Sequence, residues 1–95
     1  MYRIKTTHGF EKDFQRCLKR GLPMDKIQTV MMLLERNGCL PQQYKPHKLN
    51  GDRRGQWECH IQPNWLLVWE QHDDEFILIM LNTGTHSDLF GKTRR

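Results

Sequence analysis

The sequence predicts an α+β protein in which two amphipathic helices cover one antiparallel sheet. Two apolar stripes with helical spacing occupy the first half of the chain, and three strand-like apolar runs separated by polar turns occupy the second half. A helical hairpin followed by hairpin-linked strands is typical of this class. Because 95 residues suffice for one modest core, we expect a single domain over residues 1–95.

The first half of the chain predicts a short strand and two helices. Residues 2–5 alternate apolar and polar, as a strand does. Thr7 can cap a first helix over residues 8–20, and residues 21–23 (Gly-Leu-Pro) end it. A second helix over residues 24–37 follows so short a break that we expect an antiparallel hairpin. The apolar residues of the two stripes are Phe10, Phe14, Cys17, Leu18, Ile27, Val30, Met31 and Leu34.

The second half predicts an irregular segment and then a three-strand meander. Residues 38–56 hold several prolines and glycines and show no sustained period, and so long an irregular segment is more often functional than idle. Strands over residues 57–61, 65–69 and 75–81 follow, joined by short polar turns. The last residues, from about Thr85, predict one helical turn before a charged tail.

Composition and charge narrow the class of protein. The net charge of +4 favours a nucleic acid or an acidic protein as partner. The longest apolar run, residues 76–81, is far too short for a membrane span, and the first residues lack the apolar stretch of a signal peptide. Three scattered cysteines without a CxxC pair fit reduced thiols. We therefore expect a cytoplasmic protein without a membrane partner.

Position singles out three of the five histidines. His47 lies in a basic segment, His60 near the end of a predicted strand, and His86 just beyond the last predicted strand. In an antiparallel meander the first and third strands run in the same direction and finish at the same end of the sheet. His60 and His86 can therefore meet at that end, and the preceding loop can bring His47 to them.

Three chemistries fit such a group of histidines. One is a metal site, but no HxH or HExxH spacing and no nearby carboxylate ligand supports it, so we expect no metal and no cofactor. Another is general acid–base catalysis at a phosphodiester, since histidine titrates near neutral pH and nearby cations can stabilise phosphate charge. In the third, the histidines are polar residues that cap strand ends.

Side chains around the histidines suggest how a nucleotide would be bound. Lys48, Arg53 and Arg54 crowd one basic stretch and can supply positive charge. Trp65, at the start of a strand, is either a core residue or a platform on which a base stacks. Phe90, near the C-terminus, would ordinarily pin the tail to the body of the protein.

Read together, four segments resemble the YafQ-type branch of the RelE/ParE superfamily, the toxin halves of bacterial toxin–antitoxin pairs. They are "FEKDFQRCLKRG" (10–21), "HKLNG" (47–51), "WECHIQPNWLLVW" (57–69) and "NTGTHSDLF" (82–90). Each motif is weak alone, but their order and spacing are specific. The resemblance implies a RelE-like fold and a metal-independent endoribonuclease that cuts messenger RNA on the ribosome.

The resemblance also implies roles for individual residues. His86 would be the general acid, and His47 or His60 would be the base or would orient the phosphate. Trp65 and Phe90 would shape the nucleotide pocket or stack on the base. The implied reaction is attack of the ribose 2′-hydroxyl on the adjacent phosphorus.

Two positions depart from the family pattern. Asn82 stands where family members commonly carry arginine, and Asn64 stands where they commonly carry aspartate. Asparagine cannot replace the charge with which arginine clamps a phosphate, and the lost aspartate could have acted as a base or supported a histidine. We expect retained activity, with Arg53 or Arg54 supplying the charge missing at Asn82.

The family also implies partners and rival functions. A cognate antitoxin would cover the helices and the basic face, and operator DNA would be bound only through the antitoxin complex. One rival is a ParE-like toxin that acts on gyrase, although clustered acid–base groups argue against it. Another is a catalytically weak or inactive protein that only binds its antitoxin.

Overall fold

The computed structural model describes residues 1–91, so the predicted charged tail, residues 92–95, lies outside the described residues. One sheet, three helices and two 3-10 turns make up the described part of the chain. They are β1 (Arg3–Thr6), α1 (His8–Lys19), α2 (Met24–Asn37), η1 (Gln42–Tyr44), β2 (His47–Lys48), η2 (Gly51–Arg53), β3 (Trp57–Gln62), β4 (Trp65–His72), β5 (Ile77–Gly84) and α3 (His86–Phe90).

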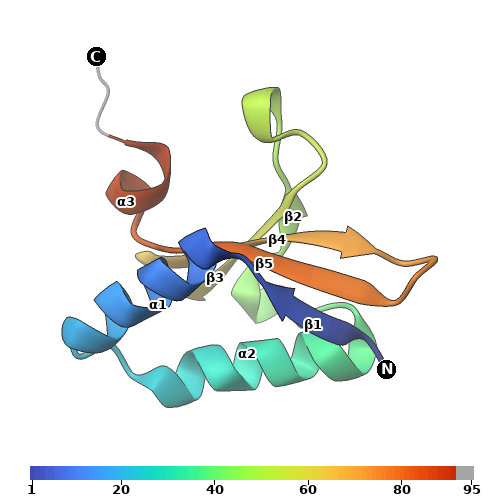
Figure 1. Ribbon diagram of the computed structural model, residues 1–95, viewed down its shortest axis with the longest axis horizontal. Coiled ribbons are helices and arrows are strands. Elements are labelled where there is room, and N and C mark those ends of the chain that lie inside the picture. The colour runs from blue at the N-terminus through green and yellow to red at the C-terminus, as the bar shows by residue number, and fades with distance from the viewer. Residues whose placement is uncertain (92–95) are drawn as a thin grey trace.

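The five strands form one sheet in the order β1-β5-β4-β3-β2. β1 pairs with β5 in parallel, whereas β2, β3, β4 and β5 are successively antiparallel. The helical hairpin of α1 and α2 lies on one side of this sheet, and α3 and the chain around η2 rise from the other side (Figure 1). The predicted α+β class, helical hairpin, meander and C-terminal turn are therefore confirmed.

Local signals begin and end the two long helices. Thr7 caps α1, because its side-chain oxygen accepts a hydrogen bond of 3.0 Å from the backbone N–H of Phe10. α2 ends at Gly38, whose φ of +69° favours glycine. The ring of Tyr2 packs so closely on Gly38 that an added Cβ would lie 2.3 Å from it. This contact fixes the end of α2 against the start of β1.

The core fills the space between the helical hairpin and the sheet. Seven of the eight predicted stripe residues take part fully or partly as expected, and Cys17, Ile27, Val30 and Leu34 are fully buried. Leu18 does not, since 48% of it is exposed. It lies at the border of the α1 stripe, one residue around the helix from Cys17. The sheet contributes Cys59, Ile61, Trp65, Leu67, Trp69, Leu78 and Met80 to this core.

A second, smaller buried layer lies on the opposite face of the sheet. Leu66 and Val68 alternate along β4 with the core residues Leu67 and Trp69, so their side chains point to the other face, yet both have no exposed surface. The chain around η2 and α3 stand on this side (Figure 1). This face, away from the hairpin, carries the candidate site.

Several predicted boundaries were wrong, among them the end of β4, which continues to His72 rather than stopping at residue 69. Residues 38–56 are not wholly irregular, because β2 pairs with β3 and two 3-10 turns flank it. β5 begins at Ile77 rather than residue 75, since Phe76 has a turn-like φ of +54°. It then continues to Gly84, because residues 82–84 still pair with β4. Within residues 1–91, no helix has the length and apolar character to cross a membrane.

Candidate active site

Three histidines from distant parts of the chain lie in a row. The ring centroids of His47 and His60 are 6.4 Å apart, and those of His60 and His86 are 6.1 Å apart. His47 and His86 are exposed and His60 is half-buried. The structure thus brings together the three histidines that topology predicted to meet.

The register of the sheet explains this juxtaposition. His47 on β2 lies opposite Glu58 on β3, and His60 lies opposite Leu66 on β4. Leu66 in turn pairs with Gly84, the last residue of β5. The chain leaves the sheet there and begins α3 two residues later, which places His86 above the same level of the sheet.

α3 is held in this place by ionic contacts with α1. Thr85 and Asp88 form a capping box, in which each side chain accepts a hydrogen bond from the other residue's backbone N–H. Asp88 also accepts hydrogen bonds of 2.7 and 3.2 Å from the guanidinium of Arg20. These bonds, chiefly that from Arg20, hold the pKa of Asp88 well below its usual range. Gly84 is needed here because an added Cβ would lie 2.7 Å from the Asp88 carboxylate.

A cation and an aromatic ring extend the row beyond His86. The Phe90 ring lies 6.1 Å from that of His86 and is 44% exposed. The Arg53 guanidinium carbon lies 5.4 Å from the centre of the Phe90 ring. Arg53 also donates a hydrogen bond of 3.0 Å to the side-chain oxygen of Asn82. Positive charge from η2 therefore reaches the position that Asn82 leaves neutral.

The His47 ring contacts an acceptor at each nitrogen. Its Nδ1 lies 2.8 Å from the backbone oxygen of Lys45, and its Nε2 lies 3.0 Å from Oε1 of Glu58. Glu58 is only 4% exposed. His60 is held less firmly, with Nδ1 at 3.4 Å from the backbone oxygen of Pro63.

Two predicted binding residues face away from the row. Lys48 follows His47 on β2 and so points to the other face, where its Nζ lies 5.6 Å from the centre of the Trp57 ring. Trp65 is 1% exposed, and its indole N–H donates to Thr83 at 2.9 Å. A base cannot stack on a ring without exposed surface, so Trp65 shapes the site only from within the core. The burial of Trp65 argues against the predicted stacking on its ring, whereas the supply of positive charge by Lys48 stays a prediction.

The remaining predicted residues lie at the periphery. Arg54 is exposed directly after η2, next to Arg53. Asn64 is exposed in the turn between β3 and β4, close in sequence to His60. Both are available to a bound ligand, but Arg53 is the cation that contacts the row.

The arrangement suits proton transfer next to a bound anion. Exposed imidazoles can accept and donate protons near neutral pH, and Arg53 can bind a phosphate oxygen. The exposed Phe90 ring offers a face to a base. Within residues 1–91, no set of three or more histidine, cysteine or acidic side chains has the geometry to hold a metal ion.

A model of a known protein family matches nearly the whole chain. The family model described as "Bacterial toxin of type II toxin-antitoxin system, YafQ" matches residues 2–91. This chain belongs to the YafQ toxin family. This membership confirms the resemblance to the RelE/ParE superfamily that the sequence motifs indicated.

Individual relatives give the YafQ family assignment more detail. The mRNA interferase toxin YafQ of Escherichia coli K12 is 37% identical over 89 residues, which cover 93% of this chain and 95% of that protein. Endoribonuclease HigB of Proteus vulgaris is 28% identical over 78 residues, 74% of this chain and 85% of HigB. These names confirm the expected enzyme class, an endoribonuclease.

A solved structure agrees with the fold of this YafQ family member. A chain of the crystal structure of the E. coli DinJ–YafQ complex matches with a TM-score of 0.86 and 35% identity. The match covers 96% of this chain and 100% of that chain. The arrangement of helices and sheet is therefore the one that YafQ toxins have.

Sequence reasoning missed the residues that support the histidines. Glu58 was identifiable, because it precedes His60 by two residues on a strand and so lies on the same face. Asp13 was not, although it accepts a hydrogen bond of 3.1 Å from the backbone N–H of Thr83 and one of 3.2 Å from Asn82. No local pattern relates a residue of α1 to the end of β5.

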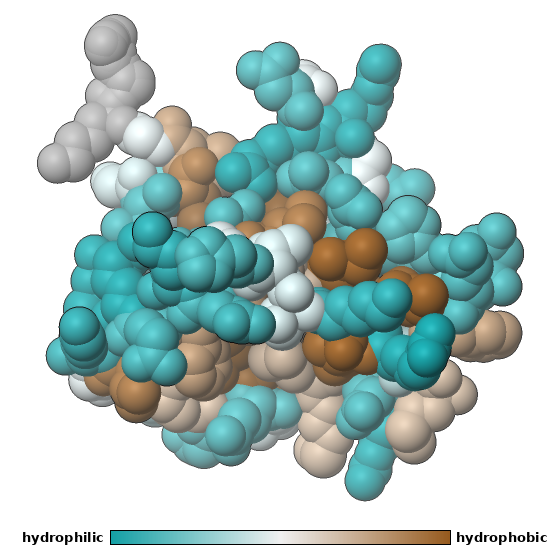
Figure 2. Space-filling model, in the orientation of Figure 1, coloured by the Kyte–Doolittle hydropathy of each residue, from teal (hydrophilic) through white to brown (hydrophobic). Residues whose placement is uncertain are grey.

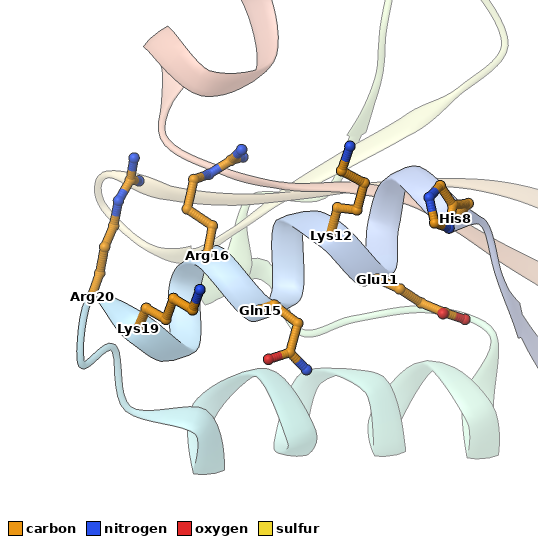
Figure 3. A pocket seen from close by; sticks show the side chains of 7 residues that line it. All are labelled: His8, Glu11, Lys12, Gln15, Arg16, Lys19 and Arg20. Atoms are coloured by element: carbon orange, nitrogen blue, oxygen red, sulfur yellow. The ribbon is translucent and has the colours of Figure 1, made fainter.

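A second basic surface lies outside the histidine row, along α1. A shallow groove of about 590 Å³ is lined by seven residues of this segment, and Lys12, Arg16 and Arg20 point to the side on which α3 lies (Figure 3). The surface over α1 is hydrophilic in the space-filling view (Figure 2). The lining residues are His8, Glu11, Lys12, Gln15, Arg16, Lys19 and Arg20.

Proposed function

We propose that this YafQ family member is an mRNA interferase that cleaves messenger RNA on the ribosome without a metal ion and thereby inhibits translation. The row of His47, His60 and His86, with neighbouring ring centroids about 6 Å apart, carries the proposal. The E. coli relative of 37% identity is named an mRNA interferase. The toxin acts as a single domain over residues 1–95, in the cytoplasm where ribosomes are.

The reaction is a transfer within the RNA backbone. The ribose 2′-oxygen forms a bond to the adjacent phosphorus while the bond from phosphorus to the next nucleotide's 5′-oxygen breaks. His47 or His60 takes the 2′-hydroxyl proton or orients the phosphate. His86, as an imidazolium, gives a proton to the departing 5′-oxygen. The products are a cyclic phosphate and a 5′-hydroxyl.

Substrate binding falls to the groups beside His86. Arg53 reaches Asn82 and lies over Phe90, so a phosphate bound there meets a guanidinium despite the neutral Asn82. The exposed Phe90 ring stacks on a base, a contact worth about 1–3 kcal/mol. Arg54 and Asn64 border the site, and Trp65 supports it from the core.

Replacing His86 tests the proposed function directly. We expect His86→Gln to slow cleavage of ribosome-bound message by roughly 10²–10⁴-fold, because it removes a positioned proton donor. The assay is a reconstituted translation reaction with mapping of cut sites and of end chemistry. His72→Gln is the control, since His72 is paired with Glu70 outside the row.

The same assay separates the rival functions. If the His86→Gln variant cleaves at the wild-type rate, the assignment of His86 as the general acid is refuted. No cut by the wild-type chain would favour a protein that only binds its antitoxin. Inhibition of gyrase without cutting would favour a ParE-like toxin.

We infer that a cognate antitoxin neutralises the toxin. The matched E. coli structure is a DinJ–YafQ complex. The basic groove of α1 suits an acidic segment of such a partner through complementary charge. Operator DNA is then bound only through the complex, and no membrane is involved. Loss of toxicity on co-expression with a candidate antitoxin, and co-purification of the two chains, test this inference.

A further inference from the structure

The carboxylate of Glu58 is a buried group that the proposed reaction leaves without a role. The residue is 4% exposed on β3, in the middle of the sheet face that carries the histidines. One of its oxygens, Oε1, lies 3.0 Å from Nε2 of His47. The other, Oε2, is buried and has no hydrogen-bond partner among the described residues.

A buried carboxylate in this setting calls for a compensating charge. Removing an ionised group from water is costly unless an opposite charge or hydrogen bonds compensate it. Its neighbour across β4 is Val68, an apolar residue. Among the described residues His47 contacts the carboxylate, so its ring is the candidate for that charge.

The hydrogen-bond geometry of His47 indicates where its protons lie. A backbone carbonyl can only accept, so Nδ1, at 2.8 Å from the oxygen of Lys45, carries a proton. When Glu58 is ionised, its carboxylate also only accepts, and Nε2, at 3.0 Å from it, then carries a second proton. A ring with two protonated nitrogens is an imidazolium cation and has no free lone pair.

We propose that Glu58 is a positioning residue that holds His47 as a doubly protonated cation facing the scissile phosphate. The role rests on the proposed ribonuclease function. His47 then stabilises negative charge on the phosphate instead of accepting the 2′-hydroxyl proton. His60, the neighbouring ring in the row, takes that proton. Glu58 thus gives His47 and His60 different roles, which the sequence alone did not distinguish.

Nuclear magnetic resonance tests the link between Glu58 and His47 without any substrate. Long-range ¹H–¹⁵N spectra of the full chain at neutral pH distinguish protonated ring nitrogens from those with a lone pair, and the spectrum of His47→Gln assigns the signals. We expect both His47 nitrogens to be protonated in the wild type and only one in Glu58→Gln. One protonated nitrogen in the wild type, or an unchanged His47 spectrum in the variant, would overturn the proposal.

Cleavage of ribosome-bound message then tests the consequence. We expect Glu58→Gln to slow cleavage roughly 10²-fold, the cost of losing one preorganised electrostatic group. Glu70→Gln is the matched control, because Glu70 makes a similar contact of 3.2 Å with His72 on the exposed side of a hairpin. A changed His47 spectrum with wild-type cleavage by Glu58→Gln would refute the positioning role.

The experiments remain decisive if the Glu58→Gln variant does not fold or if the wild-type chain has no activity. If Glu58→Gln does not fold, the wild-type spectrum still decides the protonation of His47, and Glu58→Asp, which retains the charge, should keep both nitrogens protonated and restore most of the cleavage. If the wild-type chain cuts no RNA, the proposed function fails, whereas the spectra still support or refute the Glu58–His47 link. The two failures are therefore distinguishable.

Discussion

Arg53 shows how one residue can supply what another position lacks. Its guanidinium donates to Asn82 and lies over Phe90, although η2 and β5 are far apart in the sequence. Arginine presents several donors in a rigid fork, which suits a phosphate better than a neutral amide does. Arg53 of η2 therefore supplies the cation beside His86 that Asn82 of β5 does not provide.

We expect Arg53→Ala to slow cleavage roughly 10²-fold, because it removes one electrostatic contact to the phosphate. Arg54→Ala is the matched control, since Arg54 is exposed and adjacent in sequence, and it should cleave at nearly the wild-type rate. The measurement is the cleavage rate of ribosome-bound message at fixed salt concentration.

Adding Asn82→Arg to Arg53→Ala should restore much of the lost cleavage rate, because residue 82 then carries a guanidinium at the position that Arg53 contacts in the wild-type chain. Equal rates for Arg53→Ala and Arg54→Ala would show instead that general basicity, not the contact with Asn82, matters at η2.

Residue-scale prediction succeeded where topology decided the outcome. His60 and His86 meet because the first and third strands of the antiparallel meander finish at the same end of the sheet. It did not foresee that Lys48 faces away from His47, since β2 is only a two-residue strand, too short to show the alternation in the sequence. For Trp65 it left a core position and a stacking platform both open, because a bulky residue at the start of a strand can face either side, and the structure places the ring in the core.

α3 is the element on which the proposed acid depends. A helix of five residues is not stable alone, so its position comes from tertiary contacts. Asp88 supplies them through the two bonds from Arg20, the residue that follows α1, while its capping box with Thr85 fixes the start of α3. The long N-terminal helix thereby fixes His86 and Phe90 at the far side of the sheet.

This anchoring predicts a pH-dependent contribution to stability. Because the pKa of Asp88 is lower in the folded chain than its ordinary value of about 3.9, its ionised form stabilises the fold above that pH, and the contribution is lost as the pH falls below it. We expect Asp88→Asn to lower the free energy of unfolding by about 1 kcal/mol at pH 7 and by progressively less towards pH 2. Urea unfolding at several pH values measures the difference.

The control for Asp88 is Asp74→Asn, because Asp74 is exposed in the turn between β4 and β5. It should change the free energy of unfolding by less than about 0.5 kcal/mol at either pH. A loss in Asp88→Asn that is the same at both pH values would assign its effect to packing rather than to charge.

Element-scale prediction followed the strength of the periodic signal. Both long helices and the three meander strands have clear apolar periods and were predicted within a few residues. The chain from residue 38 to residue 56 has none, since its short strand and 3-10 turns are specified by pairing with β3 and by single glycine and proline positions. The side chains that complete the site come largely from this segment and from α3.

At the scale of the whole molecule, two buried layers divide stability from function. The larger layer, between the hairpin and the sheet, holds most of the apolar side chains. The smaller layer on the other face holds Leu66 and Val68 beneath the histidines, with Glu58 beside them. The histidine side therefore rests on a rigid sheet, while its exposed surface stays open to a large substrate.

This division predicts how the three cysteines react. Cys17 and Cys59 have no exposed surface, and burial raises the pKa of both thiols, that of Cys59 to about 12. Cys39, which follows α2, is exposed. Because the thiolate is the reactive form, we expect an aromatic disulfide reagent to label one thiol rapidly in the native chain and all three in denaturant, as absorbance would show. Cys39→Ser should abolish the rapid native reaction and leave the slow one unchanged. Rapid labelling of a second thiol would mean that the layer between hairpin and sheet opens on the timescale of the reaction, and the division between a closed core and an open site would not hold.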